Sequence, residues 1–111
     1  MVKEIALIKR KAGLSREQFV ERYEGIFAPL LVERCPSIKR YVRNHIAKTV
    51  IVPPGARELE FDCVTEIWYD DIEGFRAVGD FIMSEVGSNA REELFDINES
   101  LVFLVEEKVS E

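Results

Sequence analysis

The only histidine of the chain, His45, is the first residue whose type could carry acid–base chemistry. A neutral imidazole titrates near neutrality, so it can take up or release a proton at pH 7. The alternative is a partly buried histidine that hydrogen-bonds to the backbone of a strand. The residue type alone leaves both roles open.

A carboxylate in the middle of a predicted strand is the second candidate for chemistry. Glu66 lies two residues before Trp68, so the two side chains share one face of the strand. A carboxylate beside an indole ring would be partly desolvated, which would raise its pKa toward general acid or base use. The alternative is an ion pair with Arg40 or Arg43 on the neighbouring strand.

Phenol hydroxyls are the third candidate. Tyr23 or Tyr69 in an apolar pocket could hold a substrate oxygen or donate a hydrogen bond to a developing enolate. Tyr23 also belongs to the apolar stripe of a predicted helix, so packing is the alternative role for this ring. The catalytic hypothesis is therefore His45 as the base, with Glu66 or Tyr23 assisting it.

The residues expected to bind a substrate are one arginine and three aromatic side chains. Arg43 lies two residues before His45, so it shares the histidine's face in a regular strand and could bind an anionic group. The apolar walls of such a pocket would come from Phe19, Phe27 and Trp68, which suits a flat hydrophobic ligand.

Other classes of site are not indicated. The chain has no phosphate-binding loop, nucleophile elbow or metal-ligand spacing, and its two cysteines, Cys35 and Cys63, are far apart. We therefore predict no cofactor, no metal and free thiols in a reducing compartment.

A net charge of -6 argues against nucleic-acid binding. No apolar run suits a signal peptide or a membrane span, so we expect a cytoplasmic protein that binds no membrane.

The hydrophobic periodicity predicts one domain, residues 1–111, of the α+β class. Its order is β-α-β-β-α-β, which is the ferredoxin-like pattern of a four-stranded antiparallel sheet with both helices on one face. Residues 84–100 read as a polar connector with one helical turn around 92–95. The predicted strands lie at about 3–10, 37–47, 60–69 and 100–108, the helices at 15–34 and 72–83, and a long turn at 52–60.

Two local features modify this pattern. Ser15 and Gln18 form a capping box at the start of the first helix, and Pro29 should kink or break the same helix near Phe27 and Ala28. The first and last strands are apolar on both faces, although the helices can cover only one face of the sheet. We therefore expect a homodimer in which the two uncovered sheet faces pack together into a barrel.

Four segments resemble the EthD family of the dimeric α+β barrel superfamily: "ALIKRKAGLSREQFVERYEGIFAPLL", "PSIKRYVRNHI", "TEIWYDDIEGFRA" and "SLVFLVEEK". The resemblance covers nearly the whole chain and implies a dimeric ferredoxin-like barrel with a pocket between helices and sheet. The family includes dehydratase-like proteins, and the superfamily holds cyclases, isomerases and monooxygenases that need no cofactor.

The resemblance implies a pocket histidine that this chain lacks. Family members often carry His-Ala-Pro at the end of the first helix, and this chain has Phe27-Ala28-Pro29 there. The leading hypothesis is a cofactor-independent proton-transfer enzyme, a dehydratase, cyclase or isomerase, acting on an aromatic or polyketide-like small molecule. The alternatives are a non-catalytic protein that binds a hydrophobic small molecule, which the missing histidine favours, and a cofactor-free monooxygenase.

Overall fold

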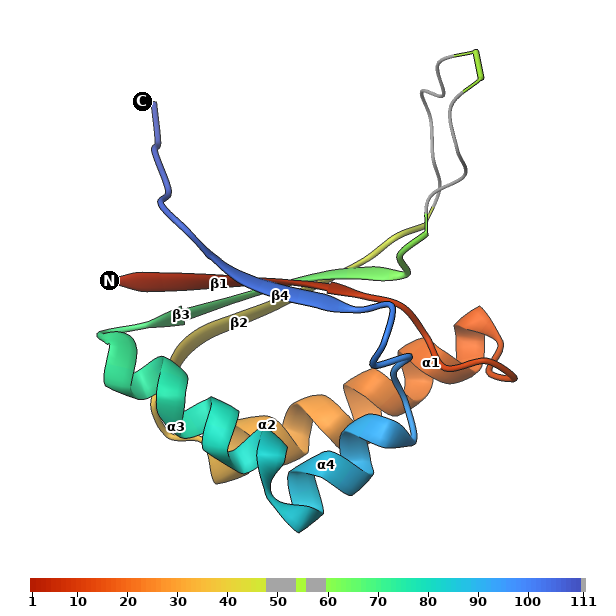
Figure 1. Cartoon of the computed structure of the whole chain (residues 1–111), viewed down its shortest axis with the longest axis horizontal. Coiled ribbons are helices and arrows are strands. Elements are labelled where there is room, and N and C mark those ends of the chain that lie inside the picture. The colour runs from red at the N-terminus through yellow and green to blue at the C-terminus, as the bar shows by residue number, and fades with distance from the viewer. Residues whose placement is uncertain (48–53, 56–59, 111) are drawn as a thin grey trace.

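The structure is a computed structural model that describes residues 1–47, 54–55 and 60–110 of the 111-residue chain. The turn predicted at 52–60 lies largely outside the described residues. Each pair of neighbouring strands is antiparallel, and the helices lie on one side of the sheet (Figure 1). The sheet has the order β2-β3-β1-β4, with β1 at Val2–Ile8, β2 at Ile38–His45, β3 at Cys63–Tyr69 and β4 at Leu101–Val105. The predicted α+β ferredoxin-like fold with a four-stranded antiparallel sheet is confirmed.

The first helical segment is continuous but changes geometry along its length. It consists of α1 (Arg16–Arg22), the π-helical turn η1 (Tyr23–Phe27) and α2 (Ala28–Arg34). The predicted capping box of Ser15 and Gln18 starts it. The predicted irregularity is present, but as a π turn just before Pro29 rather than as a break near Phe27 and Ala28.

The π turn has a consequence for which side chains face the sheet. Phe19, Tyr23, Phe27 and Leu31 follow one another at intervals of four residues, and all four are buried. In a regular α-helix residues four apart drift steadily around the axis, because one turn takes 3.6 residues. The wider π turn reverses this drift, so one stripe stays directed at the sheet along the whole segment.

The second helical segment differs from the prediction. Helix α3 (Ile72–Met83) has the predicted bounds, and the Asp71 side chain caps it. Residues 85–92, expected to belong to a polar connector, form the helix α4 (Glu85–Glu92) instead. The Ser84 side chain accepts a hydrogen bond from the backbone of Gly87 and caps α4. A Cβ on Gly87 would lie 2.1 Å from the carbonyl oxygen of Phe81, so only glycine permits this close turn between the two helices.

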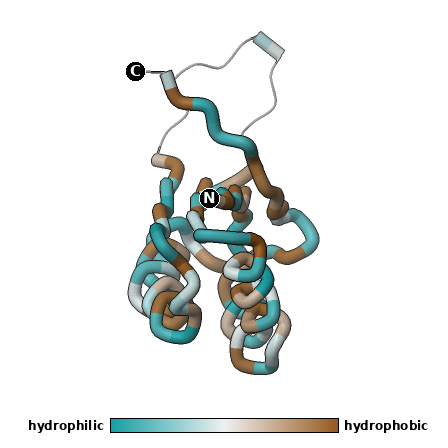
Figure 2. Tube along the Cα trace, turned by 90° about the vertical axis from the view of Figure 1, so that its left-hand side faces the viewer, coloured by the Kyte–Doolittle hydropathy of each residue, from teal (hydrophilic) through white to brown (hydrophobic). Residues whose placement is uncertain are grey.

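The two faces of the sheet have different surroundings. Side chains of Ala6, Ile8, Cys63 and Ile67 point toward the helices and belong to the core. Figure 2 shows the helices as two columns on this side of the strands. On the other face, Ile5 lies opposite Phe103 and Leu7 opposite Leu101. No described helix covers this second face, and Phe103 is 42% exposed.

Candidate functional site

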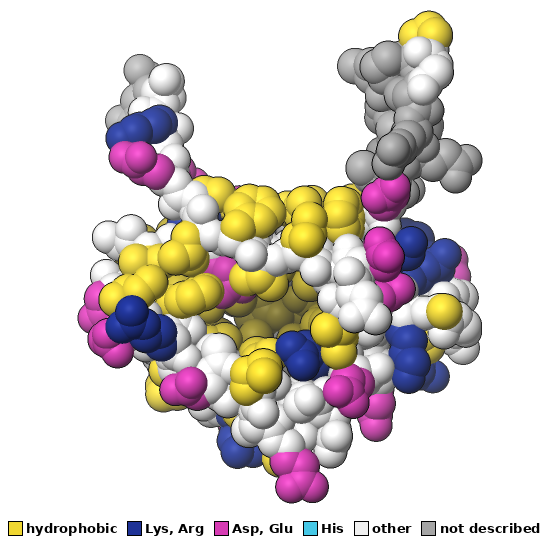
Figure 3. Space-filling view, in the orientation of Figure 1, with side chains coloured by type: hydrophobic (Ala, Val, Ile, Leu, Met, Phe, Trp, Pro, Cys, Tyr) yellow, Lys and Arg dark blue, Asp and Glu magenta, His cyan; other side chains and the backbone are white. Residues whose placement is uncertain are grey.

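A cavity of about 220 Å³ lies between the sheet and the helices. Figure 3 shows it as a hollow lined by hydrophobic side chains. It is smaller than the range typical of pockets for drug-sized ligands, so it suits a small molecule. The described residues that line it are Glu4, Ala6, Ile8, Tyr23, Phe27, Leu31, Tyr41, Thr65, Ile67, Val78, Ile82, Arg91, Phe95, Ile97, Ser100 and Val102.

The carboxyl group of this cavity is that of Glu4, in β1. It is 8% exposed, and its Oε1 accepts a hydrogen bond of 2.9 Å from the Tyr69 hydroxyl. Burial raises the pKa of Glu4 above its ordinary value, because a charged carboxylate is poorly solvated there; the Tyr69 bond opposes this rise. Glu4 can therefore hold or release a proton closer to neutrality than an exposed glutamate.

Sequence reasoning missed Glu4 as a site residue. The signal was its position, two residues before Ala6 and four before Ile8, in a strand that is apolar on both faces. The period of two puts Glu4 on the same face as Ala6 and Ile8, which is the face that the helices cover. A glutamate on a covered face must be desolvated or paired, and Glu4 is desolvated.

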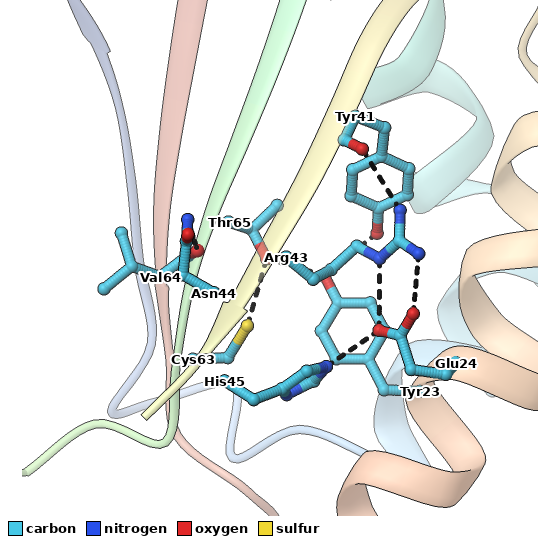
Figure 4. Close-up of polar contacts among 9 residues, drawn as sticks. All are labelled: Tyr23, Glu24, Tyr41, Arg43, Asn44, His45, Cys63, Val64 and Thr65. Atoms are coloured by element: carbon cyan, nitrogen blue, oxygen red, sulfur yellow. Dashed lines mark hydrogen bonds and ion pairs between the residues drawn. The ribbon is translucent and has the colours of Figure 1, made fainter. Parts of the chain in front are cut away.

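Three hydroxyl groups meet at one wall of the cavity. The Tyr23 hydroxyl lies 2.9 Å from the Tyr41 hydroxyl and 2.7 Å from Thr65 Oγ1 (Figure 4). Burial is the main cause that raises the pKa values of Tyr23 and Tyr41 above those of free phenols. The three groups are therefore neutral at physiological pH and can donate a hydrogen bond to a ligand oxygen or pass a proton between them.

His45 lies behind this wall rather than in the cavity lining. Its Nε2 is 2.7 Å from the Glu24 carboxylate, and its ring packs edge-on against Tyr23 with centroids 5.5 Å apart. Arg43 Nη2 donates a 2.6 Å hydrogen bond to the same carboxylate. The hydrogen bond from Arg43 holds the pKa of Glu24 below its ordinary value, and the bond to His45 adds to the effect. Arg43 and His45 share one face of β2, as predicted, and Figure 4 shows both side chains reaching Glu24 from it.

The expected location of Glu66 and Trp68 is wrong. Both side chains lie on the sheet face away from the helices, because alternation along β3 directs Thr65 and Ile67 into the core. Glu66 pairs with Lys3 at 3.0 Å rather than with Arg40 or Arg43. Lys3 lowers the pKa of Glu66, with Asn44 as a second hydrogen-bond donor. The raised carboxyl pKa expected at Glu66 is found at Glu4.

The predicted site residues therefore divide into three groups. Tyr23 and Phe27 line the cavity from the first helical segment. Phe19, Arg43 and His45 lie on the same side of the sheet but behind the lining, where the Phe19 ring contacts those of Tyr23 and His45. Tyr69 supports Glu4 from β3, and Glu66 and Trp68 lie on the far face.

Neither a metal site nor a membrane span emerges from the described part of the chain. Within residues 1–47, 54–55 and 60–110, no three His, Cys, Asp or Glu side chains are grouped so as to hold a metal ion. Over the same residues, every helix is too short or too polar to cross a membrane.

Comparison with known proteins gives a consistent result at the level of family and fold. A model of the EthD domain matches residues 11–86 of the chain. No sequence match is found among curated proteins. Among solved structures, the chain is similar to an ethyl tert-butyl ether d (EthD) family protein from Bacillus halodurans C-125. The identity is 23%, covering 97% of this chain and 99% of that one, with a TM-score of 0.63.

Two further structures share the fold at lower identity. A dimeric ferredoxin-like protein from Thermobifida fusca YX is 16% identical, covering 94% of this chain and 88% of that one, with a TM-score of 0.62. Hydroxynitrile lyase from Passiflora edulis is 15% identical, covering 98% and 96%, with a TM-score of 0.59. At such identities the likeness concerns the fold, and the chemistry has to be argued from the side chains.

Proposed function

Because this chain belongs to the EthD domain family, we propose that it is a cofactor-independent proton-transfer enzyme for a hydrophobic small molecule. The single observation that carries the proposal is the desolvated carboxyl group of Glu4, which lines an otherwise mainly apolar cavity. A carboxyl group whose pKa is raised by burial can exchange a proton with a substrate carbon or oxygen near neutral pH.

The second requirement of such a reaction is a group that stabilises negative charge. The hydroxyl wall, which consists of the hydroxyl groups of Tyr23, Tyr41 and Thr65, supplies it. Removing a proton from carbon next to a carbonyl group places negative charge on the carbonyl oxygen. The neutral hydroxyls of Tyr23, Tyr41 and Thr65 line the same cavity as Glu4 and can stabilise that charge by donating hydrogen bonds. Dehydration, cyclisation and isomerisation all need this combination of a proton acceptor and an oxyanion stabiliser.

His45 enters the proposal as a positioning residue. Its Nε2 holds Glu24, and its ring rests against the ring of Tyr23, which carries the central hydroxyl of the wall. His45 and Arg43 together attach the first helical segment to β2 through one carboxylate. This contact fixes Tyr23 relative to the sheet, so loss of His45 would disturb the hydroxyl wall without removing Glu4.

The experiment measures proton exchange directly, since the substrate is not identified. A panel of aromatic ketones and 1,3-diketones is incubated with the protein in D₂O, and deuterium incorporation at carbon is followed by NMR. Wild-type protein should accelerate incorporation for at least one compound, and Glu4→Gln should slow that rate by about 100-fold, as expected for loss of an acid–base group.

The matched control is Glu17→Gln, which changes an exposed glutamate of α1 in the same way. It should leave the exchange rate unchanged. Equal exchange rates in wild-type protein and Glu4→Gln would contradict the proposal.

A second candidate function is non-catalytic binding of a hydrophobic small molecule in the same cavity. The buried ring of Phe27, which contacts Tyr23 and Phe95, favours it, because this position lines the cavity without an acid–base group. Binding of panel compounds to wild-type protein without any deuterium incorporation would support this candidate over the enzyme.

A further inference from the structure

One charged group in the cavity has no role in the function proposed above. Arg91, in the last turn of α4, is the only basic side chain among the described residues that line the cavity. It forms no salt bridge with any described residue. Its Nε is buried and has no hydrogen-bond partner within the described part of the chain.

An unsatisfied guanidinium nitrogen is unusual in a folded protein. Arg91 as a whole is half-buried, but its Nε is enclosed. A buried N–H group without an acceptor costs free energy, so such groups are normally paired. Arg91 is therefore arranged to bind an acceptor that the chain does not itself provide. A ligand in the cavity can supply this acceptor, since Arg91 is part of the cavity lining.

Glu4 does not fill this role. Its Oε1 accepts from Tyr69, and the causes that shift its pKa are burial and the Tyr69 bond, without a contribution from Arg91. Besides its hydroxyl groups, the cavity thus carries a carboxyl group that can be protonated and, separate from it, a guanidinium group.

From this arrangement we propose that the cavity binds a small hydrophobic monocarboxylic acid whose carboxylate is held by Arg91. This inference rests on the proposed function, since it names the class of substrate for the same cavity. Arginine matches a carboxylate through two parallel N–H donors, of which the free Nε is one. One carboxylate balances the one charge of Arg91, whereas a phosphate group would bring about two negative charges into a mainly apolar cavity.

The chemistry of the proposed reaction agrees with this orientation. With its carboxylate at Arg91, the apolar body of the ligand would extend along the aromatic side chains of Phe27 and Phe95 toward Glu4 and the hydroxyl wall. The carboxylate would then serve to orient the ligand. The carbon that exchanges its proton would lie elsewhere on the molecule.

The test compares two probes of nearly equal shape, 1-naphthoate and its uncharged analogue 1-naphthamide. Binding to the full chain is measured by isothermal titration calorimetry at neutral pH and low salt. Wild-type protein should bind the naphthoate at least about tenfold more tightly, as expected for a charge-assisted pair. Arg91→Gln should abolish this preference. Arg91→Lys keeps the positive charge but lacks the two parallel N–H donors, so it should retain part of the preference.

The control variant is Arg22→Gln, which removes an exposed arginine from the first helical segment and should keep the full preference. Equal affinity of wild-type protein for the two probes, no binding of either probe, or a preference that survives in Arg91→Gln would each overturn the inference. The comparison of the two probes on wild-type protein does not depend on whether a variant folds. Failure of deuterium exchange with the naphthoate preference intact would overturn the proposed enzyme function and leave the ligand class standing.

Discussion

The Tyr69 hydroxyl donates a 2.9 Å hydrogen bond to the carboxyl group of Glu4 inside the core. The two residues come from neighbouring antiparallel strands, with Tyr69 opposite Val2 and therefore diagonal to Glu4. This pair fixes the carboxyl group at the cavity while burial keeps its pKa raised. Tyr69 thus positions the carboxyl group and partly opposes the rise of its pKa, which burial causes.

The raised pKa of Glu4 predicts a specific pH dependence of stability. Between the unfolded and the folded pKa of this residue the native state holds more protons than the unfolded state. The free energy of unfolding therefore falls as pH rises through that window and stays reduced above it. Glu4→Gln removes this loss. The difference in the free energy of unfolding, variant minus wild type, should therefore be more positive at pH 7 than at pH 4, by on the order of 1 kcal/mol. Urea denaturation at both pH values checks this; a pH-independent difference would contradict it.

Removing the hydroxyl group of Tyr69 should move the same pKa further. The Tyr69 bond favours the charged form of Glu4, so Tyr69→Phe should raise the pKa of Glu4 and destabilise the fold by about 1–2 kcal/mol. Carbon-detected NMR titration of the Glu4 carboxyl group measures the pKa. Ser37→Ala, which deletes a hydroxyl bonded to the Gly74 carbonyl outside the cavity lining, is the matched control and should leave that pKa unchanged. A fall in the Glu4 pKa in Tyr69→Phe would refute the arrangement.

The ion-pair cluster of Glu24 with Arg43 and His45 should show the opposite pH dependence, because it stabilises the protein more at higher pH than at lower pH. The folded pKa of Glu24 is lowered, so its contribution is present above the unfolded pKa and is lost as pH falls through the folded pKa. Glu24 is partly exposed and solvent screens its charges, so Glu24→Gln should cost less than about 1 kcal/mol at pH 7 and still less at pH 3. Urea denaturation measures both values. A larger cost at pH 3 than at pH 7 would refute this sign.

The uncovered sheet face should form a homodimer. Ile5, Leu7, Leu101 and Phe103 present apolar side chains there, and no described helix covers them. A glutamate in place of Phe103 would bury charge at such an interface, so Phe103→Glu should shift the protein toward monomer at micromolar concentration. Light scattering coupled to size-exclusion chromatography gives the mass. Glu17→Gln serves as the surface control, and a wild-type monomer would contradict the expectation.

Much of the fold was determined by the sequence itself. The period-two pattern of the strands, the Ser15 capping box and the place of Tyr23 in an apolar helix stripe depend on local periodicity, which the sequence shows directly. Helix α4 escaped this reasoning because it is short and polar, and its formation depends on Ser84 and on the contact of Gly87 with Phe81.

The tertiary structure decided which glutamate carries the raised pKa. Local patterns give each strand two faces and cannot say which face the helices cover, so the sequence indicated Glu66 and not Glu4 as the desolvated carboxylate. The sheet order and the packing of the helices put Glu4 beneath the helices and Glu66 on the far face beside Lys3. The same packing brought Arg91 to the cavity and put His45 behind Tyr23, since these contacts join segments far apart in the chain.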